Sequence, residues 1–260
     1  MDNKIIMDDT IKLCGNLNAL KESIENSIKK EYIVFQEQDF DAGNIEANSD
    51  MKIIVSGKRT FEAAEAYKGK KICSIDFANN HSVGGAPWYA NAQEEGLCRI
   101  STLYPCLFVK EKDFYKKHID EYNTGKIDEL GSDDLIYIPD ITVFKTDDFE
   151  PKLKDEALWF NTDVIVCAAP VLVMEYDVQE YKKLMTKRIK RILDVAAKEK
   201  VEVLIAGAFG CGAFHNPPEI VSNIFAKLIR NYNFETVEFA IYCKRDTTNY
   251  NVFHDRFFKW

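Results

Sequence analysis

Two adjacent carboxylates, Glu94 and Glu95, follow the glycine pair Gly84–Gly85 closely enough to share one site. Glycines let a backbone approach a ligand, and the pair comes directly after an apolar run and a short polar connector. Consecutive helical residues point about 100° apart, so the two carboxylates cannot oppose each other across one bond as the paired acids of common glycosidases do. If both act, one reaches the reacting bond and the other holds a neighbouring hydroxyl. Alternatively, both only favour the start of a helix through its dipole.

A second glycine loop, "GAFGCGAFHNPPE" at 207–219, lies between an apolar strand and a helix. Its glycines allow several backbone N–H groups to face a ligand, and the helix N-terminus favours an anion. The spacing of Gly207, Gly210 and Gly212 is neither a Walker A loop nor the dinucleotide fingerprint. A diphosphate cradle and a purely structural turn both remain open for this loop. Cys211 near a helix N-terminus is a poor candidate nucleophile, because no His or Asp partner is placed beside it.

The bulk composition is that of an ordinary globular protein. The 260 residues carry a net charge of −8, which argues against a general nucleic-acid or membrane-surface binder. Neither a secretory signal nor an apolar run long enough to cross a membrane is visible. The seven cysteines are scattered and lack a C-x-x-C pair, so we expect a reducing cytoplasm, and neither a metal nor a cofactor.

Helices and strands must alternate along the chain to position these loops. Helical spacing or composition predicts helices over 10–30, 59–68, 92–107, 109–121, 178–199 and the segment after the second loop. Apolar, β-branched runs predict strands over 51–57, 70–78, 135–145, 163–170, the stretch before Gly207 and 235–243, with Pro139 marking a sheet edge or a bend. This alternation favours an α/β domain with a parallel or mixed sheet covered on both faces. Because both glycine loops follow strands, we expect them to meet at one cleft.

The first stretch, "FANNHSVGGAPWYANAQEEGLCRISTLYP", resembles the signature of bacterial-type poly(ADP-ribose) glycohydrolases, in which glycines precede Gln-Glu-Glu. "IYIPDITVF", "VIVCAAP" and "VLIAGAFGCGAFHNPPEIV" also resemble that family and occur in its order. The resemblance implies a macrodomain-like mixed central sheet flanked by helices on both faces. It implies one domain over 1–260, with an N-terminal helical accessory region at about 1–50. It also implies hydrolysis of the ribose–ribose O-glycosidic bonds of poly(ADP-ribose), with ADP-ribose as the product.

The resemblance also implies roles for single residues. Glu95 is expected to be the catalytic general acid/base, and Glu94 to orient the scissile ribose. The remaining expected ligand-binding residues are Asn79, Gly84, Gly85, Gln93, Gly210, Cys211, Gly212, Ala213 and Phe214. Val83 and Ala86 depart from the family's proline and third glycine, so backbone approach at Ala86 is in question.

Two other functions remain open on sequence alone. An ADP-ribose reader would bind without cleaving, although such a protein would not need Glu95. A hydrolase of another ADP-ribosyl linkage, to a protein or a nucleic acid, would share the ADP-ribose pocket and differ only on the leaving-group side.

Overall fold

A seven-stranded sheet forms the centre of the computed structural model, which describes residues 2–40, 42–172 and 176–259. The strands are β1 (Tyr32–Val34), β2 (Lys52–Ser56), β3 (Ile72–Phe77), β4 (Leu135–Val143), β5 (Phe160–Cys167), β6 (Val203–Ala206) and β7 (Thr236–Ala240). Their order in the sheet is β1-β4-β5-β3-β6-β7-β2. From β5 to β2 all neighbours pair in parallel, whereas β4 is antiparallel to both of its neighbours. The expected mixed sheet is therefore confirmed.

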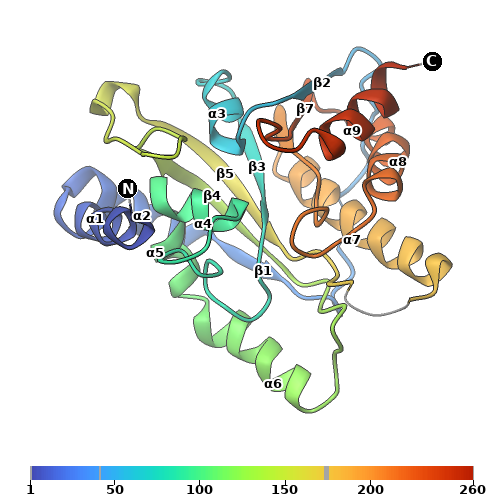
Figure 1. The fold of residues 1–260 in the computed structure, drawn as a ribbon, viewed down its shortest axis with the longest axis horizontal. Coiled ribbons are helices and arrows are strands. Elements are labelled where there is room, and N and C mark those ends of the chain that lie inside the picture. The colour runs from blue at the N-terminus through green and yellow to red at the C-terminus, as the bar shows by residue number, and fades with distance from the viewer. Residues whose placement is uncertain (1, 41, 173–175, 260) are drawn as a thin grey trace.

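Helices cover both faces of the sheet (Figure 1). One face packs against α7 (Val178–Lys198), α8 (Pro218–Leu228) and α9 (Thr248–Phe258). The opposite face packs against α1 (Asn3–Asn16), α2 (Asn18–Lys30), α3 (Thr60–Glu65), α4 (Gln93–Ile100) and α5 (Leu103–Phe108). A π-helix, η1 (Glu111–Lys116), leads into α6 (Lys117–Asn123), and short 3-10 turns occupy η2 (Glu156–Leu158) and η3 (Ile229–Asn231). The central strands are buried on both sides, which explains their near-continuous apolar sequences.

Two predicted helices are each divided in the structure. The helix expected over 10–30 breaks at Leu17, whose extended backbone (φ −85°, ψ 121°) turns the chain between α1 and α2. The break lets both helices reach a small cluster around Phe144. The helix expected over 92–107 breaks at Ser101–Thr102. Ser101 is extended (φ −145°, ψ 179°), and the Thr102 N–H donates to the Thr142 carbonyl of β4 over 3.0 Å. Tertiary contacts thus override the local helical pattern at both places.

Pro139 marks a bend within an inner strand. β4 lies between β1 and β5, and its register with β5 shifts between Ile138 and Ile141, where Asp140 has a φ of 58°. The bend is confirmed, whereas the alternative of an edge strand is wrong.

The outer face of α7 is less basic than its sequence indicates. Arg188 is fully buried, and its side chain donates to Asp133, Leu130 and Ala168. It therefore ties α7 to the carboxyl end of β5 rather than lying in solvent. The exposed basic residues of this helix are mainly its lysines.

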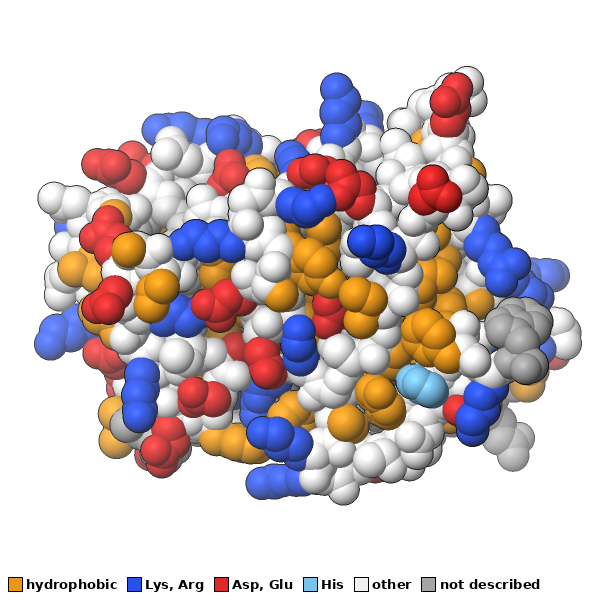
Figure 2. Space-filling view, turned by 90° about the horizontal axis from the view of Figure 1, so that it is seen from above, with side chains coloured by type: hydrophobic (Ala, Val, Ile, Leu, Met, Phe, Trp, Pro, Cys, Tyr) orange, Lys and Arg blue, Asp and Glu red, His pale blue; other side chains and the backbone are white. Residues whose placement is uncertain are grey.

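Charges of both signs are interspersed on the surface. Figure 2 shows Lys, Arg, Asp and Glu side chains mixed around exposed apolar groups, without one dominant sign on the face drawn. Among the described residues, no helix is long and apolar enough to cross a membrane.

Candidate active site

Gln93 joins the start of α4 to the end of β3. Its side-chain NH₂ donates to the Ile75 carbonyl (2.8 Å) and to the Thr60 hydroxyl (3.1 Å), and its carbonyl accepts from the Phe77 N–H (2.9 Å). The Gln93 amide thus forms hydrogen bonds with the backbone of β3 and fixes the first turn of α4 against that strand. The two residues that follow are thereby aimed at the loop after β3.

Glu94 and Glu95 are both buried, with 3% and 7% of their surfaces exposed. Glu94 Oε2 accepts from the Asn79 N–H (2.8 Å), whereas Glu95 Oε1 accepts from the Ala86 N–H (3.1 Å). The other oxygen of each carboxyl has no hydrogen-bond partner among the described residues. Each carboxyl is therefore held by one backbone amide, and its other oxygen is buried without a partner among the described residues.

The glycine pair is required because the loop runs directly over these carboxyls. Gly85 has a φ of +69°, and a Cβ built on it would lie 2.3 Å from Glu95 Oε1 and 3.1 Å from Glu94 Oε2. Gly84, at φ +64°, would in the same way meet Cys98 Sγ at 2.9 Å. Ala86 is not among the described residues with positive φ, so its methyl group causes no backbone strain. The departure from a full glycine triplet is thus compatible with the loop geometry.

Asp76 is a third carboxyl buried beneath the pair. Residues alternate across β3, so Asp76 points to the face covered by α4, and it is fully buried. Neither of its oxygens has a hydrogen-bond partner among the described residues. Burial and the nearby charge of Glu95 raise the pKa of Asp76 well above its usual range. Burial and the charge of Asp76 likewise raise the pKa of Glu94, against a smaller lowering by the Asn79 amide.

The segment between the glycines and α4 is held from below by Arg99. Its guanidinium donates to the carbonyls of Pro87 (2.9 Å) and Ala90 (2.7 Å). Asn79 closes the other end of the loop, because its side-chain oxygen accepts from the N–H groups of His81 and Ser82. The loop over the carboxyls is therefore fixed at both ends.

Asn216 organises the second glycine loop. Its buried side chain donates to the carbonyls of Pro170 (2.8 Å) and Gly210 (3.0 Å), and accepts from the Tyr181 hydroxyl (2.9 Å). Gly210 has a φ of +73°, and a Cβ there would meet Asn216 Nδ2 at 2.5 Å. Leu172 also donates its N–H to the Phe214 carbonyl. These contacts tie the loop to the segment that follows β5.

The loop presents unused amides beside the N-terminus of α8. The N–H groups of Gly210, Gly212, Ala213 and Phe214 donate to no residue that the structure describes. Pro218 occupies the first turn of the helix, as expected. Cys211 is half-buried, and burial raises the pKa of its thiol to about 12, so an ionised nucleophile is not favoured there.

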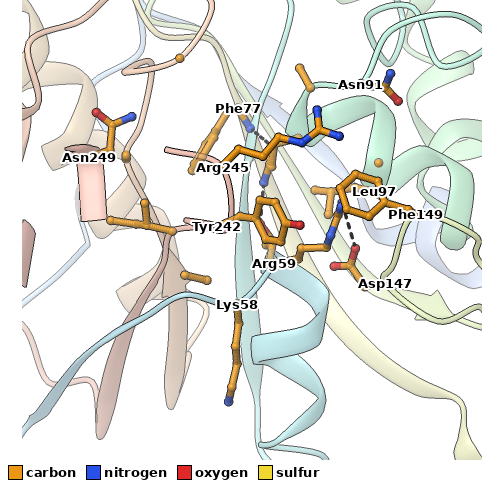
Figure 3. A pocket seen from close by; sticks show the side chains of 18 of the residues that line it. Lys58, Arg59, Phe77, Asn91, Leu97, Asp147, Phe149, Tyr242, Arg245 and Asn249 are labelled. Atoms are coloured by element: carbon orange, nitrogen blue, oxygen red, sulfur yellow. Dashed lines mark hydrogen bonds and ion pairs between the residues drawn. The ribbon is translucent and has the colours of Figure 1, made fainter. Parts of the chain in front are cut away.

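A cavity of about 750 Å³ opens beyond the carboxyl ends of four parallel strands (Figure 3). Lys58 follows β2, Phe77 ends β3, Ala208 follows β6 and Ile241 follows β7, and all four residues line it. The cavity also reaches Gln93 and Gly212. It thus extends from the base of α4 to the second glycine loop, as ligand sites do in open α/β sheets.

Aromatic and cationic side chains form the outer wall of this cavity. The Arg59 guanidinium lies 4.5 Å from the ring centroid of Phe149 and 4.6 Å from that of Tyr242. Arg245 also approaches the Phe149 ring (5.5 Å), and Asp147 pairs with Arg59 (Figure 3). Flat rings and cations in one wall suit a planar, anionic ligand.

The structure places the predicted residues in two groups, and one member of each, Gln93 and Gly212, lines the same cavity. Asn79, Gly85, Glu94 and Glu95 contact one another, while the loop from Gly210 to Phe214 follows the neighbouring strand β6. Three residues with structural roles in the site were not predicted: Asp76, Arg99 and Asn216. Asp76 had a sequence signal, because it is the only charged residue in an otherwise buried strand. Arg99 and Asn216 gave none, since they donate to backbone carbonyl groups that no residue type identifies.

Known proteins similar to this chain are found by family and by structure. The family model "Microbial-type PARG, catalytic domain" matches residues 6–146, more than half of the chain. A structure of the poly(ADP-ribose) glycohydrolase of Thermomonospora curvata is 24% identical with a TM-score of 0.85, and the match covers 98% of each chain. The Deinococcus radiodurans poly(ADP-ribose) glycohydrolase in complex with ADP-ribose is 25% identical with a TM-score of 0.77, covering 90% of this chain and 96% of that one. No curated protein matches the sequence.

Proposed function

We infer the function of this chain from the family to which it belongs, the microbial-type poly(ADP-ribose) glycohydrolase (PARG) catalytic domains. The chain hydrolyses the ribose–ribose O-glycosidic bonds of poly(ADP-ribose) and releases ADP-ribose. The observation that carries a mechanism is the state of Glu95, which is buried with one oxygen held by the Ala86 amide and the other without a partner among the described residues. That second oxygen is where a proton would be exchanged with substrate.

Glu95 is assigned the general acid and base. In its protonated form it donates to the 2′-oxygen of the leaving ribose while the bond from that oxygen to the anomeric carbon breaks. The electron pair of the bond stays with the leaving oxygen, and the anomeric carbon gains oxocarbenium character. The Glu95 carboxylate then takes a proton from water as the water oxygen bonds to the anomeric carbon. Glu95 ends protonated and ready for another turnover.

Glu94 is assigned to hold the ribose. One of its oxygens accepts from Asn79, and the other is buried and unpartnered among the described residues. A carboxyl with a raised pKa can accept from one ribose hydroxyl and donate to another, which fixes the ring relative to Glu95. The side-chain NH₂ of Asn79 donates to no described residue and would complete the contact.

The remaining parts of ADP-ribose follow from the two loops. The diphosphate is assigned to the unused amides from Gly210 to Phe214 and the N-terminus of α8, because exposed N–H groups and a helix dipole attract phosphate. The adenosine is assigned to the cavity between the strand ends. ADP-ribose bound to the Deinococcus protein supports a site for the same ligand here.

The seven free cysteines further support the reducing cytoplasm expected from the sequence.

Replacing Glu95 tests the mechanism. In Glu95→Gln we expect release of ADP-ribose from poly(ADP-ribose) to fall by about 10² to 10⁴, the usual contribution of a general acid or base. Calorimetry should show ADP-ribose affinity nearly unchanged, because the amide keeps the shape of the side chain. The exposed Glu180→Gln in α7 is the matched control and should keep full activity. Unreduced turnover in Glu95→Gln would remove Glu95 from the mechanism.

A further inference from the structure

A second cavity adjoins the glycine loop that covers Glu94 and Glu95, and neither acid lines it. Gly85 and Ala86 line this cavity of about 700 Å³. The same two residues adjoin Glu95. Gly85 packs so closely on the Glu95 carboxyl that a Cβ would not fit, and the Ala86 N–H donates to Glu95 Oε1. The wall between the acid and the second cavity is therefore a single layer of backbone.

The proposed function makes this side important, and the inference rests on it. If the adenosine of the bound unit occupies the cavity between the strand ends, its scissile ribose lies at Glu94 and Glu95. The polymer beyond the broken bond must then continue past Glu95, away from the adenosine cavity. Ala86, whose N–H donates to Glu95 Oε1, lies between Glu95 and the second cavity.

A row of aromatic rings lines the second cavity. The Trp88 and Tyr104 rings meet edge to face at 5.2 Å, and the Tyr104 and Phe108 rings are roughly parallel at 6.3 Å. The Trp88 indole N–H donates to Asp8 of α1 over 2.8 Å, which fixes the start of the row. Phe108 at the outer end is 52% exposed although it is large and apolar. Its open face is available for a flat ring to stack on.

The π-helix η1 adds positive charge to the same cavity. Lys112 and Lys116 line it, together with one acid, Glu111. Lys116 is paired with Asp120, whereas Lys112 forms no ion pair within the described part of the chain. A free lysine beside a row of rings is notable in a chain with a net charge of −8. π-Helical turns also occur frequently at functional sites.

We propose that this cavity binds the penultimate ADP-ribose unit of the polymer, the unit that carries the leaving oxygen. Its adenine stacks on Phe108, and its phosphates lie near Lys112. Stacked aromatics combined with cations are the usual means of binding single-stranded nucleotide polymers without reading a sequence. An acceptor protein would be a different occupant, but it would not need a base-stacking row next to a free cation.

Binding of monomer and oligomer separates this site from the adenosine cavity. The variants Phe108→Ala and Lys112→Ala are made in the Glu95→Gln background, so that oligomers stay intact during calorimetry. The probes are free ADP-ribose and a purified two-unit oligomer of poly(ADP-ribose). We expect each variant to weaken oligomer binding by about fivefold or more, because Phe108→Ala removes the stacking ring and Lys112→Ala removes the cation beside the phosphates. Affinity for free ADP-ribose should stay within about twofold.

Matched controls come from surfaces outside the cavity. Phe258→Ala removes an aromatic ring with similar exposure, 48%, and Lys183→Ala removes an exposed lysine of α7. Neither should change oligomer binding. Because Phe108 and Lys112 are exposed, their replacement leaves the core intact.

Three outcomes would overturn the inference. One is unchanged oligomer affinity in both cavity variants, and another is an equal loss for free ADP-ribose. A third is weaker binding of a mono-ADP-ribosylated peptide with unchanged binding of the oligomer, which would assign the cavity to a protein acceptor. Failure of the proposed function looks different, because the chain with Glu95 intact would then release no ADP-ribose from the polymer.

Discussion

At the residue scale, the position of Glu95 depends on the absence of a side chain at Gly85. The glycine allows the loop to pass so close to the Glu95 carboxyl that a Cβ on residue 85 would clash with it. The next residue then supplies the N–H that holds Glu95 Oε1. One dipeptide thus provides both the space and the hydrogen bond, so the site should be intolerant of even one added methyl group.

Gly85→Ala should therefore lose activity beyond its loss of stability. The new Cβ must displace Glu95, and a misplacement of about 1 Å can cost about a hundredfold in rate. Gly125→Ala is the matched control, because Gly125 has nearly the same φ, +70°, with nothing within 4 Å of the added Cβ. Both variants should lose about 1–2 kcal/mol of folding free energy from the left-handed backbone. ADP-ribose release and denaturant unfolding are measured on both variants. An equal fall in activity in the two variants would contradict the prediction for Gly85.

Sequence reasoning located the acids at this scale but not everything that sets their environment. The glycine spacing and the adjacent acids left a structural alternative open, and the resemblance of several motifs in order to one family is what favoured a catalytic role. The Asx turn of Asn79, the grip of Arg99 on the loop and the clasp of Asn216 depend on which backbone groups lie nearby in space. The contacts of Asn79 and Arg99 span only 2 to 12 residues, but residue types do not indicate which backbone group a side chain meets. The contact of Asn216 with Pro170 spans 46 residues, beyond the reach of any local pattern.

At the element scale, the hairpin between β4 and β5 builds one wall of the adenosine cavity. Asp147 in this hairpin accepts from the N–H groups of Phe61 (3.0 Å) and Glu62 (3.3 Å) at the start of α3. It acts as an N-cap supplied by another segment, and it also pairs with Arg59. Phe149, two residues further along, stands in the cavity wall (Figure 3).

Asp147→Ala should loosen that wall. Loss of the cap is expected to cost about 1 kcal/mol of folding free energy, and ADP-ribose should bind more weakly because Arg59 and Phe149 lose their anchor. The exposed neighbour Asp148→Ala is the control, since within the described residues its side chain accepts only from the Glu150 N–H of the same turn. Chemical denaturation and calorimetry with ADP-ribose give both numbers. Unchanged affinity in Asp147→Ala would show that the hairpin does not shape the ligand site.

Elements were predicted best where one pattern decided them. The buried strands and the long helix α7 follow from apolar runs and helical spacing alone. The divisions at Leu17 and Thr102 and the π-helical turn did not, because each exists to satisfy contacts with β4, with a neighbouring helix or with the loop after β3. Helical propensity across these points is continuous, so sequence indicates one helix where packing makes two.

At the scale of the whole molecule, the N-terminal helices belong to the packing of the site. Met7 is fully buried in the cluster that contains α4 and α5 residues, and Thr10 donates to the Arg99 carbonyl. Asp8 holds Trp88. The accessory region expected at 1–50 therefore supports the acid-bearing helix, and we propose that residues 1–260 fold as one cooperative unit.

This unity links the buried carboxyls to global stability. An aspartate whose folded-state pKa is raised above its ordinary value of 3.8 keeps its proton in the folded state, while the unfolded chain releases it. Stability is then fully present below pH 3.8 and falls as pH rises toward the folded pKa. Glu94 and Asp147 act with the same sign. The lowered pKa of Asp133 has the opposite effect on stability. Its contribution is present above pH 3.8 and is lost as the pH falls below that value.

Replacing Asp76 by Asn isolates its contribution. The amide has the same shape and no charge, so the variant should gain stability over wild type as pH rises from about 5 to 8. The gain should be up to about 1.4 kcal/mol per pH unit until Asp76 ionises in the folded protein. The exposed Asp39→Asn is the control, and its stability difference from wild type should not change with pH.

Urea unfolding, followed both by circular dichroism and by tryptophan fluorescence, measures these free energies and checks that the chain unfolds in one transition. Parallel curves for Asp76→Asn and wild type would mean that Asp76 is solvated or paired in the folded protein, and two separate transitions would refute the single cooperative unit.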